Sequence, residues 1–150
     1  MIPYTTRKAT SDDLQPAYDI RKNALGEYVK QIWGWDEDRQ WKYHLEDFDT
    51  NILSIIEVDG NAAATLEEIE KEDSILVSGI YILDKYQSNG IGRDIMKSIM
   101  AKAGSANKSV NLQVLKVNLR AKKFYLSLGF SVCGEDETHY QMIFEPKDKL

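Results

Sequence analysis

The chain has 150 residues, of which 43% are hydrophobic and 29% are charged. This length fits one domain spanning residues 1–150, and the composition excludes a globally disordered or fibrous chain. Nineteen basic against 24 acidic residues give a net charge of −5, which argues against a protein that binds nucleic acid through its phosphates and favours a cationic partner.

Cysteine usage and hydropathy limit the cellular setting. Cys133 is the only cysteine, so no intramolecular disulfide forms, and no ligand spacing predicts a metal site. No apolar run approaches the roughly 18 residues that a transmembrane helix needs. We therefore expect a cytoplasmic protein without a metal or a membrane partner, acting as a monomer or a homodimer.

The N-terminal third predicts a strand followed by two helices. Residues 4–9 form a short strand, after which Thr10 and Asp13 have the spacing of a capping box that opens a helix through about Tyr28. A second helix is predicted over residues 36–48, with acidic residues in its first turn and three apolar residues at helical spacing, namely Trp41, Leu45 and Phe48.

The remaining chain alternates strands and helices. Two apolar runs, the first of them β-branched, joined by a turn at Asp59-Gly60-Asn61 predict a hairpin over residues 52–70, and residues 74–83 predict a third strand. Apolar periodicity predicts a helix from Ile91 that ends near Gly104. A strand over residues 110–117, a helix over 118–128 and a strand over 139–145 follow. The predicted order is β-α-α-β-β-β-α-β-α-β.

Two glycines mark the junction between the third strand and the helix at Ile91. Gly90 and Gly92 leave the backbone without β-carbons where the first helical amides lack intrahelical partners, which is an arrangement that suits a phosphate group. A tight turn without a ligand explains the same glycines. The Rossmann and Walker patterns do not fit, because the third glycine of the former and the Gly-Lys-Ser/Thr of the latter are missing.

A second segment resolves this choice by resemblance. The sequence resembles the GNAT superfamily of acyl-CoA-dependent N-acetyltransferases, whose loop Gln/Arg-x-x-Gly-x-Gly/Ala is matched by Gln87, Gly90 and Gly92. The family's later segment Asn-x-x-Ala-x-x-x-Tyr-x-x-x-Gly-Phe is matched by Asn118, Ala121, Tyr125, Gly129 and Phe130. Two departures are visible: Asp84 stands where proline is common, and Ser88 stands where glycine is common.

The resemblance implies a fold and an activity. The fold is an α/β GNAT fold, with a mixed, mainly antiparallel sheet that splays where acetyl-CoA enters and is flanked by helices. The activity is transfer of the acetyl group of acetyl-CoA to a primary amine, of a small and cationic molecule, by direct attack in a ternary complex. Alternatives are acetylation of a protein N-terminus or lysine, and a non-catalytic acyl-CoA-binding sensor.

The resemblance also implies the residues that bind acetyl-CoA. The strand before the glycine loop presents backbone groups to the pantetheine arm, and the Ile80 amide is the expected donor to the thioester oxyanion, while the side chains of this strand belong to the core. The implied cofactor-binding residues are Ile80, Ile82, Gln87, Ser88, Asn89, Gly90, Ile91, Gly92, Arg93, Asn118, Ala121 and Tyr125. Lys122 is a further candidate for a phosphate contact at the rim.

Tyr125 is the candidate acid for the departing thiolate. A phenol has an unperturbed pKa of about 10, roughly matched to the coenzyme A thiol, and family members hold this tyrosine beside the sulfur. Without the motif, Tyr125 reads as a core aromatic residue. Asn118 likewise reads as a helix N-cap as well as a cofactor contact.

The general base is not identified by the motifs. Some family members carry a glutamate on the strand before the glycine loop, but Leu76 occupies that position here. Glu67 and Glu68 on the hairpin are candidates, and one of two consecutive strand residues normally faces solvent. His44 and His139 have no triad or metal spacing around them, so we assign both to structure.

Trp33 and Trp35 flank a glycine just before a run of acids. Aromatic faces beside carboxylates suit an ammonium group, which makes these residues candidates for binding the amine substrate. A hydrophobic lid packed on the first helix explains them equally well.

Overall fold

The structure is a computed structural model that describes residues 2–147. Three-residue 3-10 turns at Ser11–Asp13 and Asp84–Tyr86 precede α1 and the glycine loop. Along the chain the strands and helices are β1 (Thr5–Lys8), α1 (Leu14–Trp33), α2 (Glu37–Asp47), β2 (Leu53–Val58), β3 (Asn61–Glu70), β4 (Ser74–Ile82), α3 (Ile91–Ser105), β5 (Ser109–Leu115), α4 (Leu119–Leu128), β6 (Ser131–Glu135) and β7 (His139–Phe144).

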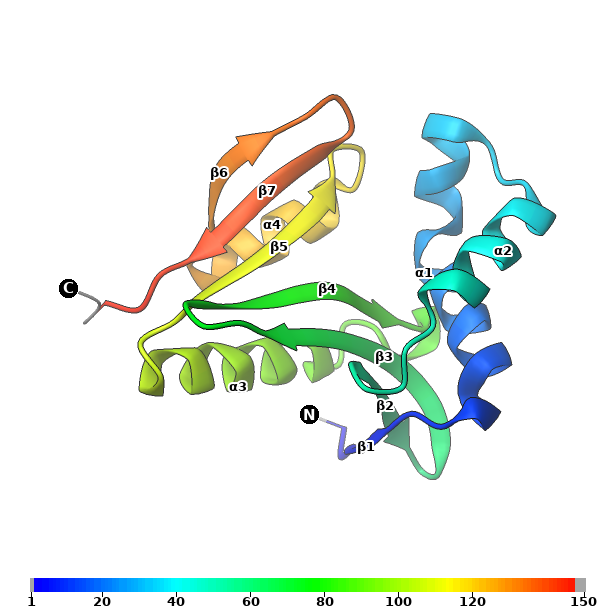
Figure 1. Ribbon diagram of the computed structural model, residues 1–150, viewed down its shortest axis with the longest axis horizontal. Coiled ribbons are helices and arrows are strands. Elements are labelled where there is room, and N and C mark those ends of the chain that lie inside the picture. Colours follow the sequence, from blue (N-terminus) through cyan, green and yellow to red (C-terminus); the bar gives the residue numbers. More distant parts are fainter. Residues whose placement is uncertain (1, 148–150) are drawn as a thin grey trace. The chain divides into compact units, whose positions relative to one another are not determined.

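The seven strands form one mixed sheet in the order β1-β2-β3-β4-β5-β7-β6 (Figure 1). The pairs β1–β2, β2–β3, β5–β7 and β6–β7 are antiparallel, and β4–β5 is parallel. The expected mixed, mainly antiparallel α/β architecture is therefore confirmed. The splay between strands at the acetyl-CoA site stays a prediction.

Backbone contacts divide the chain into two compact units. The first comprises Met1–Glu67 and Gly79–Gly92, and the second comprises Glu68–Ser78 and Arg93–Leu150. β3, β4 and α3 contribute residues to both units. The assignment of residues 1–150 to one domain stays a prediction.

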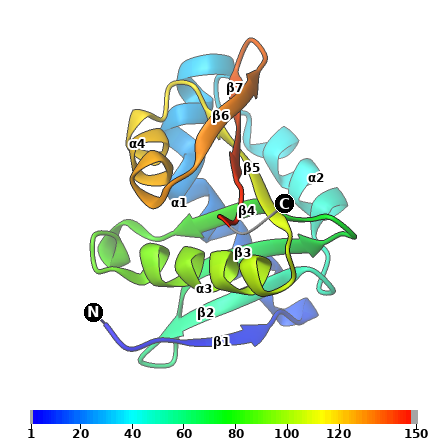
Figure 2. The same cartoon turned by 90° about the vertical axis from the view of Figure 1, so that its left-hand side faces the viewer.

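In the first unit, strands β1, β2 and β3 lie side by side (Figure 2). The β2–β3 connection lies within the expected turn segment but is only two residues long, since Asn61 already belongs to β3. Asp59 (φ 51°) and Gly60 (φ 78°) have the positive φ values that a type I′ turn requires. Leu53 and Ile55 of β2 are buried against Ala17 of α1. This contact defines the face of β2 and β3 that α1 covers.

The predicted capping box is present, and it opens the 3-10 turn Ser11–Asp13 that leads directly into α1. Thr10 and Asp13 exchange backbone–side-chain hydrogen bonds, and the Asp13 carboxylate also accepts two hydrogen bonds from Arg7, at 2.8 and 2.9 Å. The helix continues to Trp33, one and a half turns beyond the predicted end at Tyr28, and stops at Gly34 with φ 76°. The prediction ended too early, since apolar residues at helical spacing continue beyond Tyr28, at Val29 and Ile32.

The buried face of α2 differs from the predicted one. Of the three predicted inner residues, Trp41 packs against Tyr18 and Phe48 against the core cluster, but Leu45 is 49% exposed. Gln40 and His44, spaced by four residues, are buried instead. The His44 ring packs against Tyr18, and its Nε2 donates to the Leu14 carbonyl oxygen at 2.7 Å. A polar pair took the inner face because this helix packs on the polar and aromatic side of α1.

The second unit contains one strand that the sequence pattern did not predict. β6 has no alternating apolar face, is mostly exposed, and has a register shift between Val132 and Gly134, so no period-2 signal marks it. α3 begins at Ile91 as expected, and Met96 is fully buried on it. The helix runs past Gly104, and the left-handed residue after it is Asn107 (φ 56°).

Candidate functional site

The glycine loop of the first unit is held by its own side chains. Gln87 Nε2 donates to the Ile82 carbonyl oxygen at 2.8 Å, and Asn89 Nδ2 donates to the Gln87 carbonyl oxygen at 3.1 Å. The Asp84 amide donates to Asn23 Oδ1 of α1 at 2.9 Å. The loop therefore leaves β4 in a fixed direction and reaches α3 without a flexible linker.

Two residues of this loop have left-handed backbone conformations. Gly90 has φ 83°, which glycine adopts without strain, and Ser88 has φ 64°, which a serine adopts at a cost. The departure from glycine at Ser88 is therefore a departure in side chain alone, since the backbone keeps the conformation that favours glycine. α3 starts directly after Gly90, so the amides of its first turn point out of the helix towards the loop.

The strand before the loop carries the expected oxyanion donor, Ile80. The side chains of Ile80 and Ile82 are half-buried, so the expectation that they belong to the core is only partly correct. The Ile82 carbonyl oxygen already accepts a hydrogen bond from Gln87. Its second lone pair is the one left for another donor.

Tyr81, between these two residues, was missed by the sequence reasoning. An ideal β-carbon built on Gly79 stands 2.9 Å from Cε2 and 3.1 Å from the hydroxyl oxygen of Tyr81. The tyrosine ring therefore lies over the glycine. The signal in the sequence was a glycine inside a β-strand, which often marks close approach of another group.

The later motif lies in the second unit, at the start of α4. Asn118 is the N-cap, and its Oδ1 accepts from the Ala121 amide at 3.0 Å. The Tyr125 side chain is 7% exposed, with its ring centroid 5.1 Å from that of Phe124 and 5.6 Å from that of Phe130. The N-cap interpretation of Asn118 is thus correct, and Tyr125 is packed as a core aromatic residue that also carries a hydroxyl.

The two cations considered for phosphate contacts have protein partners. Arg93 Nη2 donates to Ser127 Oγ at 3.0 Å, and Lys122 Nζ lies 4.2 Å from the ring centroid of Tyr140. Lys116 Nζ lies 5.3 Å from the same ring. Any phosphate contact by Arg93 or Lys122 would compete with these interactions.

The two hairpin glutamates lie on opposite faces of β3. Glu67 is directly opposite Leu53 in the β2–β3 register, so it lies on the face that α1 covers. Glu68 turns the other way, in the second unit, and forms an ion pair with Lys102 Nζ at 2.7 Å. Of the two, Glu67 is the one that shares a face with α1 and Tyr81.

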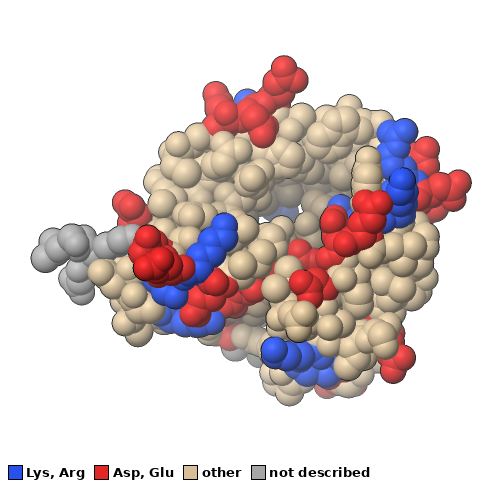
Figure 3. Space-filling model, viewed as in Figure 1, with Lys and Arg blue, Asp and Glu red and all other residues tan. Residues whose placement is uncertain are grey.

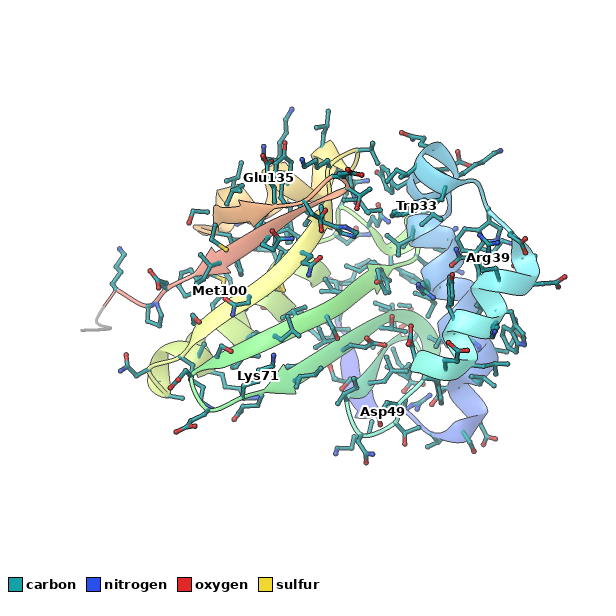
Figure 4. All side chains as sticks on the ribbon, turned by 45° about the horizontal axis from the view of Figure 1, so that its top comes forward. Trp33, Arg39, Asp49, Lys71, Met100 and Glu135 are labelled. Carbon is teal, nitrogen blue, oxygen red and sulfur yellow. The ribbon has the colours of Figure 1, made fainter. Side chains whose placement is uncertain are left out.

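The two tryptophans have different environments. Trp35 is half-buried beside Tyr18, and its indole Nε1 donates to Glu37 Oε2 at 3.2 Å. Glu37 also accepts from Tyr18 and Lys22, and this set of donors, led by Lys22, lowers the pKa of Glu37 to about 2. Figure 4 shows Trp33 at the end of α1, where its side chain is 57% exposed.

Charge is dispersed on the face in Figure 3, where acidic and basic side chains lie next to each other at several places. Within residues 2–147, no cluster of three or more His, Cys, Asp or Glu side chains has the arrangement of a metal site. In that same range, no helix combines the length and apolar character needed to cross a bilayer.

Residues 49–132 match a family model described as an acetyltransferase (GNAT) domain. This range runs from the residues just before β2 to the start of β6 and includes both motifs. Among curated proteins, none shows significant sequence similarity to the chain.

Solved structures with the same fold include three named N-acetyltransferases or their complexes. PaiA N-acetyltransferase from Thermoplasma acidophilum, in complex with coenzyme A, has a TM-score of 0.77 at 15% identity, covering 96% of this chain and 99% of that chain. The ribosomal-protein-S18-alanine N-acetyltransferase from Escherichia coli has 0.71 at 19%, covering 95% and 94%. Naa50 from Arabidopsis thaliana, in complex with the bisubstrate analogue CoA-Ac-MVNAL, has 0.68 at 13%, covering 96% and 99%.

Proposed function

Because the chain belongs to the GNAT acetyltransferase family and is an acyltransferase that uses acetyl-CoA, we propose that it acetylates the primary amine of a small cationic molecule. The observation that carries this proposal is the loop from Gln87 to Gly92, which has left-handed conformations at Ser88 and Gly90 and opens α3. Backbone amides at such a helix start suit the pyrophosphate of acetyl-CoA.

The reaction that we propose is a direct attack in a ternary complex. The neutral amine forms a C–N bond with the thioester carbon, and the oxyanion that develops accepts a hydrogen bond from the Ile80 amide. The C–S bond then breaks, the sulfur takes a proton from the Tyr125 phenol, and the nitrogen gives one proton to the base. Proton exchange with water returns both groups to their starting states.

Glu67 is our candidate for that base. Its carboxylate lies on the face of β3 that α1 covers, and it is half-buried. Glu68 is a weaker candidate because its carboxylate is paired with Lys102 Nζ at 2.7 Å, on the other face of β3. An acidic group at this position also attracts an ammonium ion before it loses its proton.

A protein N-terminus is the second candidate acceptor. Two structures of the same fold are named for, or bound to, such substrates: the ribosomal-protein-S18-alanine N-acetyltransferase, and Naa50 with its CoA-Ac-MVNAL analogue. At identities of 19% and 13%, these structures bear on the fold, so the acceptor class is decided by assay.

The test is coenzyme A release from acetyl-CoA with three probes: 1,4-diaminobutane, phenethylamine and the peptide Met-Val-Asn-Ala-Leu. We expect turnover with one of the two small amines and an acetylated product in mass spectrometry. Turnover of the peptide alone would replace the small-molecule proposal with the second candidate. Absence of turnover with all three, at millimolar concentrations, would contradict both.

A further inference from the structure

In β4, the ring of Tyr81 lies over Gly79, two residues before it. The motifs that bind acetyl-CoA do not explain this arrangement. A side chain at position 79 would collide with the ring of Tyr81, since the ideal β-carbon stands 2.9 Å from Cε2. Contacts this short do not occur for real β-carbons. The glycine therefore makes room for a phenol that lies back along its own strand.

The phenol lies on the face of the sheet that carries Glu67. The Leu83 amide donates to the Ala63 carbonyl oxygen at 3.0 Å, which fixes the pairing of β4 with β3 at this end. Counting back by two residues from this bond puts Tyr81 opposite Thr65, on the same face of the sheet as Glu67. The register differs by one residue at the turn, where the Lys71 amide donates to the Ser74 carbonyl oxygen. The Tyr81 ring leans back along the strand, with its hydroxyl 3.1 Å from the β-carbon position of Gly79, on the face of the sheet that carries Glu67.

Charged groups from the elements packed on this face act on the phenol. Burial raises the pKa of Tyr81, the positive charge of Arg21 in α1 and a hydrogen bond from its side chain lower it, and the negative charges of Glu67 and Asp47 raise it. The net effect is an increase, so the phenol keeps its proton at neutral and mildly alkaline pH. A protonated phenol both donates and accepts hydrogen bonds.

This place in the strand is next to the proposed chemistry. Ile80, the expected oxyanion donor, lies between Gly79 and Tyr81 in sequence, and the Asn23–Asp84 hydrogen bond ties α1 to the segment just after the strand. With the thioester beside Ile80, as proposed above, a group held over Gly79 would be adjacent to it. On the same face of the sheet, Glu67 would receive the proton of the attacking amine.

We propose that Tyr81, held over Gly79, is a binding residue of the acceptor site, whose hydroxyl contacts the amine that Glu67 deprotonates. This inference rests on the proposed function. It assigns to the β4 segment a recognition role for the acceptor, in addition to the backbone role for acetyl-CoA. The ring also fills the space above Gly79, which limits the width of the acceptor group at this point.

The experiment is a double-mutant cycle on the full chain, using whichever of the three probes has the highest kcat/KM. Tyr81→Phe removes only the hydroxyl and should raise the acceptor KM by roughly three- to tenfold, the effect of one hydrogen bond. Gly79→Ala displaces the ring and should have an effect of about the same size. Acetyl-CoA Kd, measured by calorimetry, should change by less than about twofold in both variants.

The second arm of the cycle separates ring displacement from damage to the strand. In a Tyr81→Ala background, adding Gly79→Ala should change the acceptor KM by less than about twofold, because the group that collides is gone. Gly26→Ala in α1 is the matched control, since its nearest heavy atom would be 4.0 Å away, and it should leave KM unchanged.

Two results would overturn the inference while leaving the proposed function intact. One is an unchanged acceptor KM in Tyr81→Phe. The other is an equal effect of Gly79→Ala with and without the Tyr81 ring. Absence of turnover in the unaltered protein is a different result, because it contradicts the proposed function and with it the inference.

Discussion

Gln87 is hydrogen-bonded to the backbone of the strand that it follows, through Nε2 and the Ile82 carbonyl oxygen at 2.8 Å. The residue that the family motif places first in the acetyl-CoA loop thus shapes the loop from within. The same side chain lies 3.4 Å from Asp84 Oδ1. Gln87 is therefore in a position to act on acetyl-CoA by fixing the loop, in addition to any contact of its own.

Replacing Gln87 with Ala should weaken acetyl-CoA binding by roughly three- to tenfold, because one net hydrogen bond of about 1 kcal/mol no longer holds the loop. Calorimetry measures the Kd. Gln15→Ala is the control, since Gln15 also donates from Nε2, to Asp19 at 2.9 Å, on the exposed side of α1. Equal acetyl-CoA affinity in Gln87→Ala and the unaltered protein would show that Gln87 does not contribute to acetyl-CoA binding.

Ser88 offers a test of the loop conformation. Ser88→Gly suits φ 64° and should keep acetyl-CoA affinity within about twofold. Ser88→Val places a β-branched residue in a conformation that it strongly disfavours, and should weaken binding by roughly tenfold or more. Similar affinities for the two variants would show that binding does not depend on the left-handed conformation.

Tyr125→Phe keeps the packing of the ring against Phe124 and Phe130 and removes the hydroxyl. We expect kcat to fall by roughly ten- to a thousandfold, with little change in acetyl-CoA Kd, if the phenol protonates the thiolate. Tyr43→Phe, on the exposed surface of α2, should leave kcat unchanged. An unaltered kcat in Tyr125→Phe would assign the residue to the core alone.

The two tryptophans should respond differently to replacement by leucine. Trp35→Leu removes the indole donor to Glu37 and the packing on Tyr18, so the free energy of unfolding should fall by about 1 to 3 kcal/mol with the acceptor KM unchanged. Trp33→Leu, at a mostly exposed site, should alter stability by less than about 0.5 kcal/mol. A rise in the acceptor KM with Trp35→Leu would show instead that Trp35 binds the amine substrate.

His44 should make stability depend on pH. Burial lowers the pKa of His44 below its ordinary value of 6.5, although the Leu14 carbonyl acts against this. The folded state therefore holds His44 neutral, and stability that is full above pH 6.5 is lost as the pH falls towards the lower folded pKa. Urea denaturation between pH 7.5 and 5.5 should show this slope in His139→Gln and lose it in His44→Gln.

Much of the fold was predictable because local signals agreed with tertiary packing. The Asp59-Gly60 turn, the Thr10–Asp13 capping box and the start of α3 at Ile91 each combine a specific backbone requirement with a suitable residue. β6 was missed because an exposed edge strand with a bulge carries no apolar alternation. Leu45 was placed inside because apolar spacing alone does not show which neighbours a helix meets.

Part of the candidate site could likewise be predicted from the sequence, and part could not. The two glycine-containing motifs identified the loop and α4 because their spacing along the chain is specific. Tyr81 gave no such signal, since its position depends on Gly79 beneath its ring and on β3 beside it. The choice of Glu67 over Glu68 likewise needed the β2–β3 register, because adjacent strand residues differ only in the face they occupy.

Thermal denaturation with acetyl-CoA tests the central claim most directly. A ligand that binds only the folded state adds RT ln(1 + [L]/Kd), about 2.7 kcal/mol at a hundredfold excess over Kd, so the Tm should rise with acetyl-CoA concentration. Gly90→Val, which strains a residue with φ 83°, should stay folded and lose that rise. A Tm of the unaltered protein that stays constant up to millimolar acetyl-CoA would contradict the account.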